Sequence, residues 1–201
     1  MSDTKVYLIG GTSGAGKTTL GRTLAIRLGW TSLSIDDLMV AAKAVTTPES
    51  HPGLHVMGKK TFKEYYTTSS IDQLASDADA QHKTIWPAVE KVIRNHATFG
   101  SPIVMDGWVM RPQWVSDLQL PNVSAFWLVT NRAVLEERER KNTEFIAGST
   151  DPERMFNNFL ARSLWFNDFT RREATRLKLP ILEQDGTKSA EELCDIILDR
   201  S

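Results

Sequence analysis

Residues 11 to 18 read Gly-Thr-Ser-Gly-Ala-Gly-Lys-Thr, a complete match to the pattern G-x-x-x-x-G-K-[ST]. The apolar run Val6-Tyr-Leu-Ile9 comes directly before this stretch, and a helical pattern beginning at Lys17 follows it. A strand, a glycine-rich loop and a helix in this order point backbone N–H groups and the positive end of a helix dipole at one anion. The chain is therefore predicted to bind a nucleoside triphosphate.

Within this loop, glycines free the backbone to curl around phosphate groups. Lys17 is expected to reach the terminal phosphates and to act in catalysis, and the Thr18 hydroxyl is expected to complete the coordination of Mg²⁺. The predicted nucleotide-binding residues of the loop are Gly11, Thr12, Ser13, Gly14, Ala15, Gly16, Lys17 and Thr18.

The composition disfavours several classes of protein, among them one that acts on nucleic acid. The 201 residues carry a formal net charge of −1, which gives no global attraction to nucleic acid or to an anionic membrane. No apolar stretch is long enough to span a bilayer, and Met1–Lys5 lacks the apolar core of a secretory signal. The lone Cys194 cannot form an internal disulfide, and a small buried hydrophobe is its expected role, with a reactive thiol as the alternative. These features point to the cytoplasm.

Short apolar segments alternate with helical patterns, which favours a parallel sheet with helices on both faces. The helix after the loop has leucines at four-residue spacing and is expected to end at Gly29. A capping box, Ser189-Ala-Glu-Glu192, is expected to start the last helix. The strands are predicted at residues 6–9, 32–35, 102–105, 123–129 and 179–182.

Two stretches exceed a minimal sheet-and-helix core and leave the carboxyl ends of strands, where ligands bind in open α/β sheets. Residues 38–100 are interpreted as a helical substrate-binding insertion. It has a first helical segment capped by Ser70 and a second run that Pro87 either kinks or opens. Residues 131–162 are polar and arginine-rich, as expected of a lid.

Acidic residues follow two of the predicted strands. Asp36 and Asp37 end the second strand, where a carboxylate can accept a proton from a substrate hydroxyl or hold a metal-bound water. Adjacent residues that leave a strand point in opposite directions, so one of the pair is expected to face the site. We favour Asp36, with Asp37 as the alternative or a helix cap. The other interpretation is that both aspartates are ordinary turn or N-cap residues with no role in the site.

Asp106 ends the third strand, as a Walker B carboxylate that serves Mg²⁺ together with Thr18 would. Gly107 would allow close approach of a substrate to the backbone. Arg111 could clamp an anionic group of the substrate or lie solvated on the surface.

Charge around the β- and γ-phosphates is expected from the lid. Arg132 and Arg138 are the predicted nucleotide contacts there, Arg138 with a catalytic role. The same helix would place Glu136 and Glu137 four residues before Arg140 and Lys141, so a solvated, salt-bridged face is the competing interpretation. Arg162 and the pair Arg171-Arg172 are further candidates on the next helix.

Together, the Gly10–Thr19 loop, the Asp-Asp and Asp-Gly strand ends and the arginine-rich lid resemble those of the small P-loop kinases. That group includes the nucleoside monophosphate, gluconate, shikimate and chloramphenicol kinases. The Gly-Gly-Thr-Ser opening and the Asp106-Gly-Trp-x-x-x-Pro112 stretch are most similar to 2-phosphoglycerate kinase-like proteins.

This resemblance covers nearly the whole chain and implies a single kinase domain over residues 1–201 with three α/β/α layers. It implies a five-stranded parallel sheet in the order 2-3-1-4-5. It also implies that Thr19 binds the α-phosphate, that the loop around Thr187 lies against adenine, and that Asp36 activates the acceptor hydroxyl.

The leading hypothesis is therefore an enzyme that uses ATP and Mg²⁺ to phosphorylate a hydroxyl of a small molecule. Substrate contacts are expected from Asp36, Asp37, Asp106, Gly107 and Arg111. The competing class is a nucleotide-dependent binding module or a regulatory ATPase with a macromolecular partner. Thr130-Asn-Arg-Ala133 lacks the guanine-reading Asn-Lys-x-Asp string, which disfavours a GTPase. No motif identifies the acceptor or an oligomeric state.

Overall fold

The computed structural model describes residues 4–141 and 143–200. Within these ranges, five parallel strands form one sheet in the order β2-β3-β1-β4-β5, which confirms the predicted order. Met1–Asp3 lie outside the described residues. They are part of the segment Met1–Lys5 that was expected to lack a secretory signal. The strands are β1 (Val6–Gly11), β2 (Thr31–Ser34), β3 (Ile103–Asp106), β4 (Val123–Thr130) and β5 (Ile181–Gln184).

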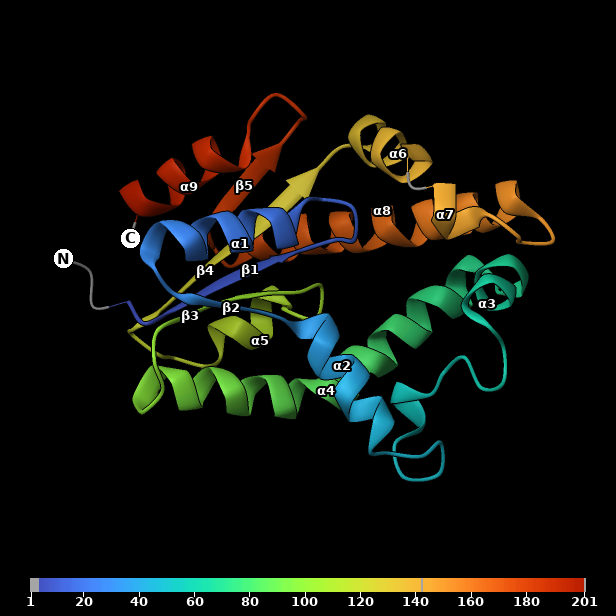
Figure 1. Ribbon diagram of the computed structural model, residues 1–201, viewed down its shortest axis with the longest axis horizontal. Helices are drawn as coiled ribbons and strands as arrows, with labels where there is room; N and C mark the ends of the chain where they lie inside the picture. Colours follow the sequence, from blue (N-terminus) through green and yellow to red (C-terminus); the bar gives the residue numbers. More distant parts are fainter. Residues whose placement is uncertain (1–3, 142, 201) are drawn as a thin grey trace.

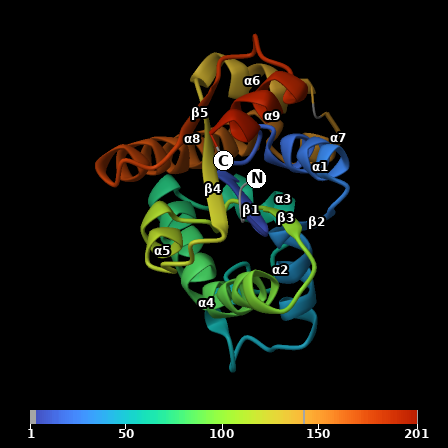
Figure 2. The same cartoon turned by 90° about the vertical axis from the view of Figure 1, so that its left-hand side faces the viewer.

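Helices cover both faces of this sheet and complete three layers (Figures 1 and 2). The helices α1 (Lys17–Leu28) and α9 (Ala190–Asp199) pack on one face, where Tyr7 and Ile9 of β1 are buried. The opposite face is covered by α4 (Ile71–Thr98), α5 (Pro112–Ser116) and α8 (Pro152–Arg176), and there Val6 and Leu8 are buried. The alternation of side chains along β1 therefore divides the core into two halves.

The remaining helices gather beyond the carboxyl ends of the strands (Figure 1). They are α2 (Ile35–Ala44), the 3₁₀ turn η1 (Pro52–Leu54), α3 (Phe62–Thr68), α6 (Arg132–Lys141) and α7 (Thr143–Ile146). Tyr65 and Tyr66 of α3 pack on Met155 and Phe159 of α8. This arrangement places the insertion and the lid around the edge of the sheet where parallel α/β proteins bind ligands.

One long helix, α4, replaces the two helical segments predicted within the insertion, and that prediction is wrong. The Ser70 hydroxyl caps it by accepting a hydrogen bond from the backbone N–H of Gln73. Pro87 lies inside the helix, where the missing N–H and the ring clash cost ~3 kcal/mol in a typical helix. An apolar face buried against the sheet and α8 keeps the helix continuous, and this face includes Ile85, Val89 and Ile93.

β5 begins two residues later than predicted because α8 ends with a capping turn. The backbone N–H of Leu179 donates to the carbonyl of Ala174 at 2.9 Å, and Lys178 has a left-handed φ of 55°. Leu179 is therefore still bonded to the helix end and cannot join the sheet. Among the described residues, no helix is both long enough and apolar enough to cross a membrane.

Candidate active site

The glycine-rich loop connects β1 to α1, and several of its residues have backbone conformations or close contacts that require glycine. Gly11 belongs to β1, and a Cβ atom there would lie 2.2 Å from the carbonyl oxygen of Leu128 on β4. Gly14 has a φ of 77°, which favours glycine. The hydroxyl of Thr12 donates to the carbonyl of Ser163 at 2.7 Å and fastens the loop to α8.

Lys17 begins α1 and is buried beneath the loop. Its ammonium group donates to the Thr12 carbonyl at 2.8 Å. Burial lowers the pKa of Lys17 to about 8, whereas the nearby carboxylates of Asp36 and Asp106 raise it. The structure therefore places one buried cation and two of the predicted acidic residues in the same electrostatic environment.

Thr18 and Asp106 lie together as predicted for a metal site. The Thr18 hydroxyl donates to Oδ2 of Asp106 at 2.8 Å, and Asp106 is buried at the end of β3. Burial raises the pKa of the Asp106 carboxyl, and the Thr18 hydrogen bond opposes this rise. A hydroxyl and a carboxylate are hard oxygen donors of the kind that Mg²⁺ prefers, so these residues fit that ion.

Asp36 and Asp37 do not end a strand, and this part of the prediction is wrong. β2 stops at Ser34. The Ser34 hydroxyl caps α2 by accepting a hydrogen bond from the backbone N–H of Asp36 at 3.4 Å. Both aspartates therefore occupy the first turn of α2, where carboxylates favour the positive end of the helix dipole. Both are exposed. Asp36 is close enough to Lys17, Asp106 and Lys43 to influence the pKa of each.

Arg138 of the lid contacts the loop directly. Its guanidinium donates to the carbonyls of Gly14 at 3.1 Å and of Ala15 at 2.8 Å. A hollow of about 330 Å³ opens beside this contact, between the loop, α6 and the segment after β5. The residues that line it are Gly14, Gly16, Thr19, Leu20, Arg138, Gln184, Lys188, Ala190 and Leu193.

Of the nucleotide contacts predicted outside the loop, Arg138 lines this hollow, whereas Thr187 and Arg132 do not. Thr187 is exposed, and its hydroxyl is held by Asp185 at 2.5 Å, whereas Lys188 of the same segment lines the hollow. Arg132, the first residue of α6, lines a separate hollow of about 560 Å³ together with Trp165 and Asp168 of α8.

Gly107 and Arg111 have packing roles that the sequence did not indicate. A Cβ atom on Gly107 would lie 2.6 Å from Cβ of Ile35. Ile35 therefore occupies the space beside Gly107 where the prediction expected a substrate. Arg111 is buried, so the solvated alternative is wrong. It forms an ion pair with Asp79 and donates to Nδ1 of His82 at 3.2 Å, which ties α5 to α4.

Arg162 of α8 is a stronger candidate than its position in the sequence indicated. Its guanidinium donates to the Ser13 hydroxyl at 3.2 Å and to the Tyr66 hydroxyl, so it links the loop to α3. The group lies 4.5 Å from the Trp108 ring centroid and 4.8 Å from that of Phe159. It is buried, its Nε atom has no partner, and no carboxylate of the described residues forms an ion pair with it.

Glu139 of α6 is a second residue that sequence reasoning missed at this site. Its carboxylate lies against Gly14, and it is buried although its helix is otherwise polar. Arg140 and Lys141 instead form the surface pairs with Glu136 and Glu137 that the competing interpretation required. Glu139 differs from these surface residues only in the direction that its side chain takes from α6. A sequence of alternating charges does not predict that direction.

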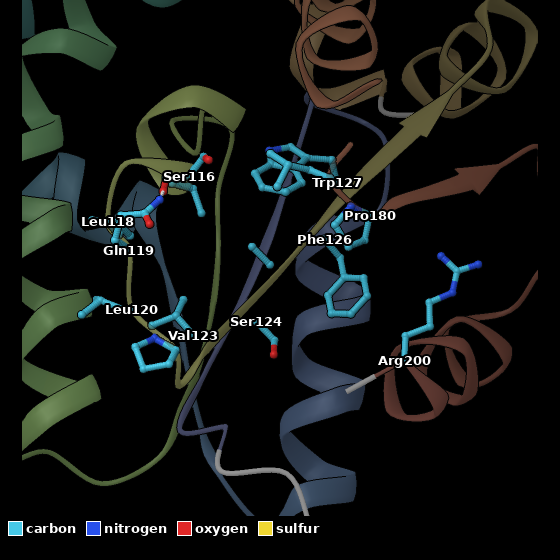
Figure 3. Close-up of a pocket in the computed structure, with 14 residues that line it drawn as sticks. Ser116, Leu118, Gln119, Leu120, Val123, Ser124, Phe126, Trp127, Pro180 and Arg200 are labelled. Carbon is cyan, nitrogen blue, oxygen red and sulfur yellow. Dashed lines mark hydrogen bonds between the residues drawn. The ribbon is translucent and has the colours of Figure 1, made fainter. Parts of the chain in front are cut away.

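A further hollow of about 540 Å³ lies away from these residues, along the first half of β4 (Figure 3). Ser116, Leu118 and Gln119 line one side, and Trp127, Pro180 and Arg200 line the other (Figure 3). It opens where β5 does not extend beside β4, since the pairing of these strands begins at Trp127. None of the predicted site residues lines it.

The sheet order, the loop after β1 and the aspartate at the end of β3 define a P-loop protein of the three-layer α/β/α type. The chain belongs to the chloramphenicol phosphotransferase-like protein family, whose model matches residues 4–156.

Individual proteins are similar to the chain in sequence or in fold. A 2-phosphoglycerate kinase of Pyrococcus horikoshii is 24% identical over 179 residues, which are 89% of this chain and 58% of that protein. The chain thus spans little more than half the length of this relative. A gluconokinase from Sinorhizobium meliloti has a similar fold, with a TM-score of 0.57 and 16% identity over 99% of this chain and 92% of its own. A shikimate kinase from Aquifex aeolicus has a TM-score of 0.53 and 15% identity, with 97% and 94% covered.

Proposed function

We propose that this protein is an ATP-dependent kinase that transfers the γ-phosphoryl group of MgATP to a hydroxyl of a small molecule. One observation carries the proposal: the buried Lys17 ammonium lies under a glycine-rich loop and within the electrostatic reach of Asp36 and Asp106. Phosphoryl transfer needs such a cation beside one carboxylate for the metal and another for the acceptor. Family membership and the kinases among the similar proteins support the same activity.

The nucleotide end of the site follows from the loop. The triphosphate would lie along the loop between Gly14 and Thr19, with Lys17 at the β- and γ-phosphates. The hollow beside Arg138 and Lys188 would take the adenosine. Thr18 and Asp106 would hold Mg²⁺, which would supply positive charge to neutralise the phosphate groups when it is bound.

We assign the acceptor end to Asp36, which is exposed at the start of α2 and close enough to Lys17 to raise its pKa. Its carboxylate would take the proton of the acceptor hydroxyl as that oxygen bonds to the γ-phosphorus. The bond from the γ-phosphorus to the β–γ bridging oxygen then breaks, and ADP leaves. Arg138 and Arg162 are the cations available to the transferred group, because both contact the loop.

Hydroxy acids and their phosphate esters are the first acceptors to test. The relatives named as 2-phosphoglycerate kinases support this class, and so does the buried, unpaired guanidinium of Arg162, which suits an anion. We also place the protein in the cytoplasm, because its one cysteine, Cys194, is buried and free.

A screen of ATP consumption tests the proposal. The protein is incubated with MgATP and a panel of phosphorylated acids, sugar acids, sugars, nucleosides and antibiotics, and Lys17→Ala serves as the control. The proposal expects ADP formation that depends on one acceptor class, with a phosphorylated product and no turnover in the control. ATP hydrolysis stimulated by a macromolecular partner, with no phosphorylated small molecule, would favour a regulatory ATPase instead.

A further inference from the structure

The proposed chemistry leaves one buried ionisable group of the site unexplained, and that group is Glu139. Its side chain is 8% exposed although it lies in the last turns of a strongly polar helix. A Cβ atom on Gly14 would lie 2.5 Å from Oε1 of Glu139 and 3.1 Å from Cδ2 of Leu135. The carboxylate of α6 therefore rests directly on the phosphate loop at its central glycine.

Cations face this carboxylate from two other elements. Burial raises the pKa of the Glu139 carboxyl, and Arg162 of α8 and Lys17 of α1 oppose this rise. Arg138, the preceding residue, is bonded to loop carbonyls. The neighbouring Glu137 differs, since it is exposed and pairs with Lys141 at 2.6 Å.

A carboxylate and a phosphate group would bind the same cations of this site. Both are anions, and both seek the Lys17 ammonium and the Arg162 guanidinium. A phosphate group placed on the loop beside an ionised Glu139 would meet a like charge at short range and in a partly desolvated setting, where repulsion is strong. The two anions cannot share the loop without a large cost, so one must leave when the other arrives.

We infer that Glu139 sets the anion affinity of the phosphate loop: its carboxylate serves as the resident anion of the nucleotide-free protein, and the incoming phosphate chain displaces it. The inference rests on the proposed function in assuming that the loop binds phosphate groups. A lone inorganic anion makes few contacts and competes poorly, whereas a nucleotide triphosphate makes many.

Calorimetric titration with pyrophosphate and with MgATP tests this role in the full chain. The variants are Glu139→Gln, which removes the charge and keeps the shape, and Glu137→Gln, which removes the same charge from the solvent side of the same helix. We expect Glu139→Gln to bind both ligands about tenfold more tightly than the wild type, a change of ~1.4 kcal/mol. Glu137→Gln should stay within about twofold of the wild type, because screening by water weakens its effect.

Unchanged or weaker binding by Glu139→Gln would overturn the inference, since a residue that merely supports α6 would loosen the site when altered. Glu139→Ala is the second variant, and it should also bind more tightly. Loss of folding in both variants would assign Glu139 a structural role and would equally overturn it. Absence of MgATP binding by the wild type, with pyrophosphate binding still tightened by Glu139→Gln, would refute the proposed nucleotide and leave this inference standing.

Discussion

Burial of the Lys17 ammonium connects the chemistry of a single residue to nucleotide binding. The side chain is held under the loop by the Thr12 carbonyl, and its pKa of about 8 leaves it only partly protonated in mildly alkaline solution. A bound triphosphate favours the charged form, so the pKa of Lys17 must be higher in the complex than in the free protein. Binding and protonation are therefore linked.

The affinity for MgATP should depend on pH above about 8. Below that pH, Lys17 is charged in both the free and the bound protein, and this group adds no pH dependence. Above it, binding must take up a proton, so the dissociation constant should rise by up to about tenfold per pH unit. Titrations at pH 7, 8 and 9 measure this, with Lys17→Arg as the control. A wild-type profile as flat as that of this permanently charged variant would contradict the assignment.

Asp36→Asn should separate binding from transfer once an acceptor is known. Loss of the proton acceptor should lower kcat by about a hundredfold, while the dissociation constant of MgATP changes little. Asp37→Asn is the matched control, since it alters the neighbouring carboxylate in the same helical turn. Steady-state kinetics and calorimetry on both variants give the comparison. Equal losses in the two variants would remove the special role of Asp36.

Local sequence predicted the residues whose position follows from the motif, and it failed where distant segments meet. Lys17 and Thr18 have positions fixed by the strand, loop and helix around them, and Asp106 ends the strand paired beside β1. Arg162 lies 149 residues from Ser13 along the chain, so no local sequence pattern predicts their contact. The solvated alternative for Arg111 was wrong for the same reason, because its partners Asp79 and His82 come from α4.

At the level of elements, capping residues correctly predicted where two helices begin. At β2, however, the cap of the next helix was mistaken for part of the strand. The Ser70 cap lies where it was predicted, as does the capping box at Ser189, because caps depend on contacts within four residues. Ser34 shows the converse. It ends β2 and caps α2 at once, so no residue separates the two elements and the aspartates fall in the helix. Propensity alone does not resolve a strand that passes directly into a helix.

The capping box of α9 offers a test of stability at this scale. The Ser189 hydroxyl accepts from the N–H of Glu192, and the Glu192 carboxylate accepts from the N–H of Ser189 at 2.8 Å. Ser189→Ala should lower the free energy of unfolding by ~1 kcal/mol, as typical N-caps do. Denaturation of this variant, of Glu192→Ala and of the double variant measures the coupling. Strictly additive losses would mean that the two side chains act independently.

At the scale of the whole molecule, the parallel sheet brings distant parts of the chain to one edge. The loop after β1, the start of α2, the end of β3 and the lid after β4 all lie beyond the carboxyl ends of the strands (Figure 1). The sheet order was predictable through resemblance to small P-loop kinases. The continuity of α4 was not, because packing of its apolar face on the sheet and α8 outweighs the local effect of Pro87.

Nucleotide binding should stabilise the whole fold. MgATP at one hundred times its dissociation constant adds ~2.7 kcal/mol to the free energy of unfolding. For a chain of this size, 1 kcal/mol shifts the melting temperature by ~2–4 °C, so a rise of ~5–11 °C is expected. Thermal denaturation with and without MgATP measures the shift, and Lys17→Ala should show little of it. A rise of the same size in that variant would place the nucleotide elsewhere on the protein.

Calorimetric titration of the wild-type protein with MgATP tests the central claim most directly. The account predicts one binding site per chain, with at least about tenfold weaker binding when Lys17 is replaced by alanine, the loss of ~1.4 kcal/mol or more expected for a buried charge on phosphate. A wild-type protein that releases or absorbs no heat of binding at any accessible nucleotide concentration, at more than one temperature, would contradict it.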